Sequence, residues 1–146
     1  MSEQHDPIVI TSTTDRTGLV QRLHDETLPE LEFWFSDVTP GSDELALVAW
    51  DGDNAVGYLI ATVPPAGQLD IWEHGVVPSA RHQGVGRRLL GDLARRAGTG
   101  RRLHLDPAHV LDPDRTRDYY TQFGFAQVEG EMVADAEELG RRTGAT

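Results

Sequence analysis

The chain of 146 residues contains neither cysteine nor lysine. Without cysteine it can form no disulfide, no cysteine-ligated zinc site and no cysteine nucleophile. It also lacks an apolar run long enough to span a bilayer, so no membrane partner is expected. The first ten residues, MSEQHDPIVI, have neither the basic region nor the apolar core of a signal peptide. Their composition predicts a cytoplasmic location.

Negative charge dominates, with 24 Asp and Glu against 13 basic residues, all of them arginine, and a formal net charge of −11. Such a chain is repelled by a phosphate backbone, so we do not expect nucleic acid as a partner. The balance favours a cationic small molecule or peptide, although solubility alone also accounts for an acidic surface. Seven of the arginines lie between Arg81 and Arg102, so the positive charge is concentrated in one stretch.

Length and composition predict one domain over residues 8–133, with a loose tail over 1–7 and another over 134–146. The apolar periodicity predicts strands over 8–12, 44–50, 55–63, 69–77, 101–106 and 125–133. It predicts helices over 14–28, 31–35, 84–97 and 112–123. Asp51–Asn54 should join the second and third strands as a hairpin. This order indicates an α/β or α+β sheet with helices on both faces.

The central stretch is the turn between the strand over 69–77 and the helix that begins at Gly84. It reads Arg81-His82-Gln83-Gly84-Val85-Gly86. A helix start has free N–H groups and the positive end of the macrodipole, and glycines let a ligand approach the backbone. The turn therefore predicts a phosphate or pyrophosphate site, with a tight turn that binds nothing as the alternative.

Two segments carry a family resemblance. Residues 76–90, VVPSARHQGVGRRLL, resemble motif A of the GCN5-related N-acetyltransferases (GNAT), V-x-P-x-x-[RQ]-x-x-G-x-[GA] followed by an apolar helix. Residues 119–125, YYTQFGF, resemble the aromatic-Y-x-x-x-G-F segment of the same family. The resemblance extends over about residues 8–133. It implies a GNAT-like central mixed, mostly antiparallel sheet with helices on both faces and a splayed strand pair.

The resemblance also implies an activity, the transfer of acetyl from acetyl-CoA to a primary amine of a small molecule or peptide by direct attack in a ternary complex. The backbone from Gln83 to Arg87 would hold the pyrophosphate, with added charge from Arg87 or Arg88. Arg81 would orient the loop or contact phosphate, while the backbone of Val76 and Val77 would meet the pantetheine arm. The cofactor-binding residues so predicted are Val76, Val77, Arg81, His82, Gln83, Gly84, Val85, Gly86, Arg87 and Tyr120.

For the chemistry, Tyr120 falls at the family's tyrosine position and is the predicted acid for the leaving thiolate. Period-two alternation puts Asp70 and His74 on one face of their strand and Glu73 on the other, unless a bulge reverses Glu73. Asp70 matches the position of a catalytic glutamate in some members, and His74 titrates near neutral pH. We rank His74 and Asp70 first as the base, then Glu73. Asp106, which closes the next strand, is a further candidate, and some family members have no single essential base.

Several alternatives stay open. Trp34 and Phe35 are core residues or part of the acceptor wall. The short last strand has no partner after it, so a second subunit of a homodimer could complete the acceptor pocket. His104 and His109 fit no zinc spacing, and no metal is expected. A noncatalytic acyl-CoA-binding domain is the second hypothesis. A nucleotide-binding fragment is disfavoured because the helix opening lacks the third glycine of that fingerprint.

Overall fold

The structure is a computed structural model that describes residues 8–106 and 113–144. Within them, seven strands form one mixed sheet in the order β1-β2-β3-β4-β5-β7-β6. Every neighbouring pair is antiparallel except β4 and β5, which run parallel. The strands are β1 (Val9–Ser12), β2 (Glu44–Asp51), β3 (Asn54–Thr62), β4 (Leu69–Val76), β5 (Arg102–Leu105), β6 (Ala126–Val128) and β7 (Glu131–Asp135).

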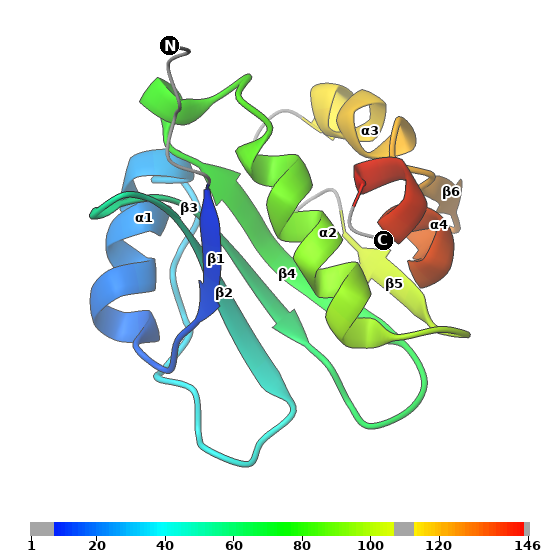
Figure 1. The fold of residues 1–146 in the computed structure, drawn as a ribbon, viewed down its shortest axis with the longest axis horizontal. Helices are drawn as coiled ribbons and strands as arrows, with labels where there is room; N and C mark the ends of the chain where they lie inside the picture. The colour runs from blue at the N-terminus through cyan, green and yellow to red at the C-terminus, as the bar shows by residue number, and fades with distance from the viewer. Residues whose placement is uncertain (1–7, 107–112, 145–146) are drawn as a thin grey trace, which may run out of the picture.

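Helices cover both faces of this sheet. They are α1 (Gln21–Thr27), which follows a π-helical turn over Arg16–Val20, α2 (Val85–Ala97), α3 (Pro113–Thr121) and α4 (Ala136–Thr143). Helix α2 crosses one face beside α4 (Figure 1). A Cβ added to Gly57 of β3 would lie 3.0 Å from Val85 of α2, whereas one added to Gly75 of β4 would lie 2.9 Å from Thr27 of α1. Helices α1 and α2 therefore pack on opposite faces, which we call the α1 face and the α2 face.

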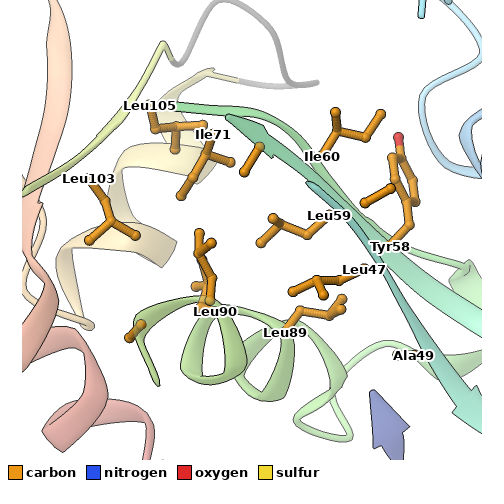
Figure 2. Close-up of a cluster of buried hydrophobic side chains, with 14 of the residues drawn as sticks. Leu47, Ala49, Tyr58, Leu59, Ile60, Ile71, Leu89, Leu90, Leu103 and Leu105 are labelled. Carbon is orange, nitrogen blue, oxygen red and sulfur yellow. The ribbon is translucent and has the colours of Figure 1, made fainter. Parts of the chain in front are cut away.

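The main core lies between the sheet and α2. Leu89 and Leu90 on α2 are fully buried, because their helical spacing directs both toward the strands. Leu59 of β3 points toward them, and its neighbour Tyr58 points to the α1 face (Figure 2). This alternation confirms β3 as a strand buried on both faces, and it brings a tyrosine hydroxyl beneath α1.

The predicted fold class is confirmed, including the β2–β3 hairpin, in which Asp51 pairs with Asn54. Two local predictions are wrong. Residues 31–35 form no helix, and the single strand expected over 125–133 is the hairpin β6–β7. That hairpin turns at Glu129 and Gly130, whose φ angles are 51° and 87°. Glutamate rarely adopts positive φ, so Gly130 was the one local signal of this turn, and it was overlooked.

The expected tail over 134–146 contains an ordered helix. Helix α4 begins at its N-cap Asp135, whose side chain accepts a hydrogen bond from the Glu138 amide at 3.1 Å. It packs on α2 through buried Leu139. The expected last strand does have a following partner, because β6 pairs with β7. The length of that strand is therefore no longer a reason to expect another subunit at the site. The predicted helix start at Asp112 lies outside the described residues, and no helix within the described ranges is long and apolar enough to cross a bilayer.

Candidate active site

A β-bulge in β4 organises the site. Across the β3–β4 ladder, Ile60 lies opposite Glu73 and Ala61 opposite Ile71, so Trp72 is an extra residue on β4. A bulge of this kind reverses the side-chain alternation beyond it. Ile71 points to the α2 face (Figure 2). Beyond the bulge Glu73 contacts α1, and His74 contacts α2. The regular alternation is therefore wrong, Asp70 and His74 are on opposite faces, and the bulged alternative is the one that forms.

The bulge coincides with the point where β4 leaves β5. The two strands pair only over Leu69–Ile71 and Leu103–Leu105. From Trp72 onward β4 has no partner on that side among the described residues. The resemblance implied a splayed strand pair, and this is where it lies. Glu73 and His74 thus occupy opposite faces of the sheet at the split.

A groove of about 990 Å³ opens at the split and at the start of α2. No acidic side chain lines it among the described residues, although the chain as a whole carries a net charge of −11. Basic side chains do line it, namely Arg81, Arg87 and Arg142. A groove with this charge selects an anion. Its described lining also includes Thr27, Leu28, His74, Gly75, Val76, Ala80, His82, Gln83, Gly84, Val85, Gly86, Tyr119, Tyr120, Gln122 and Phe123.

The turn before α2 presents its backbone to this groove. His82 and Gly84 have positive φ angles of 66° and 82°, and Gly84 is the N-cap of α2 without a side-chain cap. No turn, loop or cap hydrogen bond among the described residues uses the amides of residues 82–87. Free amides at a helix N-terminus bind phosphate well. The geometry therefore fits a pyrophosphate at the place where the sequence predicted one.

The contacts of three arginines and two valines refine the predicted cofactor set. The Arg81 Nε–H donates to the Val76 carbonyl at 2.9 Å, so this side chain holds the loop. The Val77 amide donates to Val56 at 2.9 Å and is used by the sheet, and Val77 does not line the groove. Arg87 lines the groove, but Arg88 donates to the Ile8 carbonyl at 2.6 Å and points away. Of the two arginines considered for extra charge, Arg87 alone is suitably placed.

On the α2 face, His74 links the predicted acid to the phosphate-binding helix. Its Nε2 lies 3.0 Å from the Gly86 carbonyl, which can only accept, so Nε2 carries a hydrogen. Its Nδ1 lies 2.6 Å from the Tyr120 hydroxyl. Burial lowers the pKa of His74 to about 4, so the ring is neutral near pH 7 and Nδ1 accepts the tyrosine proton. Burial likewise raises the pKa of Tyr120 well above its usual value.

On the α1 face, Glu73 is almost fully buried, with 3% of its surface exposed. Its Oε1 lies 2.7 Å from the Tyr58 hydroxyl and 2.7 Å from His24 Nδ1. The other nitrogen of His24 lies 2.7 Å from the Leu31 carbonyl. Burial, reinforced by the charge of Glu73, raises the pKa of Tyr58, so its hydroxyl keeps its proton and donates to the carboxylate.

The remaining candidates are more peripheral. Asp70 is half-buried, accepts a hydrogen bond from Gln68 Nε2 at 2.8 Å and does not line the groove. Asp106 follows the end of β5 and is also half-buried. Trp34 is 62% exposed and stacks on buried Phe35 with ring centroids 4.0 Å apart. Its ring also meets Trp72 edge-on at 6.1 Å, so an aromatic surface adjoins the bulge.

Sequence reasoning missed His24, Thr27, Tyr58 and Arg142. In the N-terminal helix the apolar positions Val20 and Leu23 continue, at spacings of three and four, through His24 and Thr27. A polar pair on a helix stripe that faces the core is the signal that could have found them. Arg142 was unpredictable because it belongs to a helix that was read as a tail. Among the described residues no group of three or more metal-ligating side chains forms, and His109 lies outside them.

Residues 42–127 match the family model described as an acetyltransferase (GNAT) domain. Over 56 residues the chain is 43% identical to the L-2,4-diaminobutyric acid acetyltransferase of Shouchella clausii. That match covers 37% of the chain and 32% of the relative, so the chain spans about a third of that protein's length.

Solved structures show the same fold at low sequence identity. One is a proposed N-acetyltransferase from E. coli bound to coenzyme A, with a TM-score of 0.71 and 17% identity, covering 89% of this chain and 99% of that one. Another is an aminoglycoside acetyltransferase from an uncultured soil metagenomic sample in complex with sisomicin. Its TM-score is 0.62 at 17% identity, covering 78% of this chain and 85% of that one.

Proposed function

The chain belongs to the GNAT family of acetyltransferases, and on that premise we propose that it transfers an acetyl group from acetyl-CoA to a primary amine. One observation carries the proposal. The groove beside the free amides of residues 82–87 is lined by arginines and by no described acidic residue, in a protein that is otherwise strongly negative. This arrangement suits a polyanionic co-substrate, and a structural neighbour is solved with coenzyme A bound.

We propose that the pyrophosphate rests on the amides of residues 83–87, with Arg81 holding the loop and Arg87 adding charge. The acyl arm would then run along the unpaired edge of β4 toward Glu73 and His74. Glu73 and His74 lie on opposite faces of the split, and of the two only His74 lines the groove. Direct attack in a ternary complex requires the amine and the thioester to be held together in one geometry.

The predicted acid is Tyr120, which is one of the residues that line the groove. Attack of the neutral amine on the thioester carbonyl gives a tetrahedral intermediate, and its collapse breaks the C–S bond. Tyr120 would turn its proton from His74 Nδ1 to the departing sulfur. In the neutral state His74 offers a lone pair to that hydroxyl, so we assign His74 to orienting Tyr120 rather than to taking the amine proton.

The acceptor is proposed to be a cationic amine. The net charge of −11 favours its approach, and the exposed ring of Trp34 beside Trp72 offers aromatic faces that attract ammonium groups. The named activities of two similar proteins, on diaminobutyric acid and on an aminoglycoside, concern amines as well. We therefore place small polyamines, diamino acids and aminoglycosides first among the acceptors to be tested.

The groove is tested by comparing coenzyme A with pantetheine in thermal unfolding. A ligand that binds the native state raises the melting temperature by mass action. Coenzyme A should give the larger shift, since pantetheine lacks the phosphates. Equal shifts would contradict a pyrophosphate site.

The activity itself is tested with a panel of amines and detection of the released thiol. Turnover with at least one cationic amine is expected. Tight binding of acetyl-CoA without turnover on any amine would instead favour a noncatalytic acyl-CoA-binding domain.

A further inference from the structure

Of the three tyrosines in the chain, Tyr119 on α3 is the one whose hydroxyl has no partner among the described residues. Tyr58 donates to Glu73, and the Tyr120 hydroxyl is bound to His74. The Tyr119 hydroxyl is also not one of the sealed polar atoms in the described part of the chain. Buried tyrosines usually place this group on a partner, so the unpaired hydroxyl of half-buried Tyr119 is available to a ligand.

The Tyr119 hydroxyl lies directly against the first turn of α2. A Cβ added to Gly86 would lie 2.4 Å from the Tyr119 oxygen and 3.4 Å from the His74 ring. The oxygen is therefore almost in contact with the backbone of α2, at a place where only glycine leaves room for it. Tyr119, Gly86 and His74 all line the groove. An open donor thus meets the turn on the side that faces His74.

Neighbouring rings hold Tyr119 in this place. Tyr120 meets the ring edge-on with centroids 5.1 Å apart, and Phe123 does so at 5.2 Å. Because the ring is already fixed, its hydroxyl loses little further freedom when it binds a ligand. Burial raises the pKa of Tyr119 to about 12, so the hydroxyl keeps its proton near neutral pH and can donate it.

A second side-chain donor reaches the same turn at another point. Arg87 lines the groove, and a Cβ added to Gly84 would lie 3.6 Å from one of its terminal nitrogens. The charge of Arg87 also opposes the effect of burial on the pKa of Tyr119, which places the two side chains near each other. Two donors therefore bracket the first turn of α2, Arg87 at Gly84 and Tyr119 at Gly86.

We propose that the Tyr119 hydroxyl donates a hydrogen bond to the phosphoryl group nearest the pantetheine arm, while Arg87 binds the outer phosphoryl group of the diphosphate. The inference rests on the proposed function and adds a specificity-determining residue to its co-substrate site. The order of the two groups follows from position. Gly86 contacts His74, toward which the acyl arm is proposed to run, whereas an added Cβ at Gly84 would meet Arg87 alone.

The neighbouring donors are less suited to the inner phosphoryl group. Tyr120 is 3% exposed and its hydroxyl is bound to His74. Arg81 donates to the Val76 carbonyl and holds the loop. A purely structural role would not require the Tyr119 hydroxyl, because the ring packing would be the same in phenylalanine.

Tyr119→Phe tests the proposal against three ligands in isothermal titration. Coenzyme A has both phosphoryl groups of the diphosphate, phosphopantetheine keeps only the inner one, and pantetheine has neither. The Kd of coenzyme A and that of phosphopantetheine should each rise by about tenfold or more, as expected for a lost hydrogen bond to a charged group. The Kd of pantetheine should stay within about a factor of two. An unchanged Kd for phosphopantetheine, or an equal rise for all three ligands, would overturn the proposal.

Arg87→Gln should give the reciprocal pattern. The Kd of coenzyme A should rise by about tenfold, because a charge-assisted contact to the outer phosphoryl group is lost. That of phosphopantetheine should change much less, since it lacks the group that Arg87 binds. The opposite pattern, with phosphopantetheine more sensitive to Arg87 than to Tyr119, would overturn the assignment.

The matched control is Tyr58→Phe, which removes one hydroxyl on the α1 face, outside the groove lining. Its Kd values for the three ligands should equal those of the wild type. It should, however, unfold at a lower temperature, because its hydroxyl is hydrogen-bonded to Glu73. Tyr119→Phe should leave the melting temperature of the free protein unchanged, since no hydrogen bond is lost. A weakening of coenzyme A binding by Tyr58→Phe as large as that by Tyr119→Phe would overturn the proposal.

Turnover separates binding from chemistry. Tyr119→Phe should raise KM for acetyl-CoA while kcat at saturation stays within about a factor of two, as expected for a contact made equally before and during reaction. A large fall in kcat with unchanged Kd would overturn the binding role.

The two levels of inference fail differently. A wild type that prefers coenzyme A to pantetheine, with the full preference retained in Tyr119→Phe, would overturn this inference alone. A wild type that binds both ligands equally would overturn the proposed function as well.

Discussion

Two histidines, one on each face of β4, are held in nearly the same way and differ in one partner. Each donates from Nε2 to a backbone carbonyl, His74 to Gly86 and His24 to Leu31. At Nδ1, however, His74 meets a tyrosine hydroxyl, whereas His24 meets a carboxylate. A hydroxyl can donate to a neutral ring, but an ionised carboxylate can only accept. The same side chain therefore binds a hydroxyl on the α2 face and a carboxylate on the α1 face.

The difference assigns the two faces different tasks. A neutral, desolvated histidine orients a hydroxyl without adding charge near a polyanion. A histidine that contacts a carboxylate fixes the orientation of that carboxylate beneath α1. The sheet itself separates the two, because the bulge at Trp72 sends Glu73 and His74 in opposite directions.

The largest effect should come from removing the His24 ring, which contacts the buried Glu73 carboxylate at 2.7 Å. His24→Phe leaves a buried carboxylate without its partner, and the loss of one member of such a pair costs about 3–5 kcal/mol. His74→Phe leaves the Tyr120 hydroxyl and the Gly86 carbonyl without this hydrogen-bond partner. Because both groups are neutral, the loss of stability should be smaller, about 1–3 kcal/mol. Urea unfolding of both variants measures the contrast. Equal losses would remove the distinction between the two faces.

Next in size is the effect of Tyr120→Phe on turnover. Because it removes the predicted proton donor, kcat should fall by about 100-fold. The Kd of coenzyme A should stay within a factor of two, as measured by isothermal titration. A variant that binds coenzyme A poorly but turns over normally at saturation would move Tyr120 from chemistry to binding.

Gly75→Ala should disturb the α1 face and spare the other. Its new Cβ would lie 2.8 Å from the Tyr58 ring and 2.9 Å from the Thr27 hydroxyl. Overpacking of this kind costs about 1–3 kcal/mol. We expect kcat/KM for the amine to fall while coenzyme A binding changes little. The matching change on the α2 face is Gly86→Ala. Its new Cβ would collide with the Tyr119 hydroxyl, so this variant should bind coenzyme A more weakly.

The most gradual effect, and the smallest near neutral pH, is a slope in the pH dependence of stability. The pKa of His74 is lowered by burial to about 4 in the folded protein and is near 6.5 when unfolded. Between these values the unfolded chain binds more protons, so the free energy of unfolding falls as pH drops from 6.5 to 4. One such group changes the free energy of unfolding by at most about 1.4 kcal/mol per pH unit.

Stability curves of the wild type and His74→Gln over this range test the slope. The slope of the free energy of unfolding against pH should be smaller in the glutamine variant. Identical curves would show that His74 does not stay neutral.

The sequence predicted the order of elements and the anion-binding turn because these depend on local patterns. Glycines at 84 and 86, the proline at 78 and the leucine spacing after them all act within one strand–helix unit. The bulge at Trp72 could not be placed this way, since it is set by the register of β4 on β3. The partnership of His24 with Glu73 joins residues 49 positions apart and depends on that same register.

Errors at the carboxyl end have another physical origin. Glu129 adopts a left-handed conformation that glutamate rarely takes, so Gly130 was the one local sign of a turn there and was overlooked. Without that turn β7 was missed, and α4 was read as a frayed acidic segment. The helix is held by its packing on α2, which is a tertiary effect that overrides its polar composition.

Helix α4 packs on α2 and contributes Arg142 to the lining of the groove. The Arg142 side chain also donates to the Gln122 carbonyl at 3.3 Å. The positive charge at that end of the groove therefore depends on the docking of α4 against α2. Substitutions between these two helices, far from any backbone amide of the turn, should be felt in the affinity for coenzyme A.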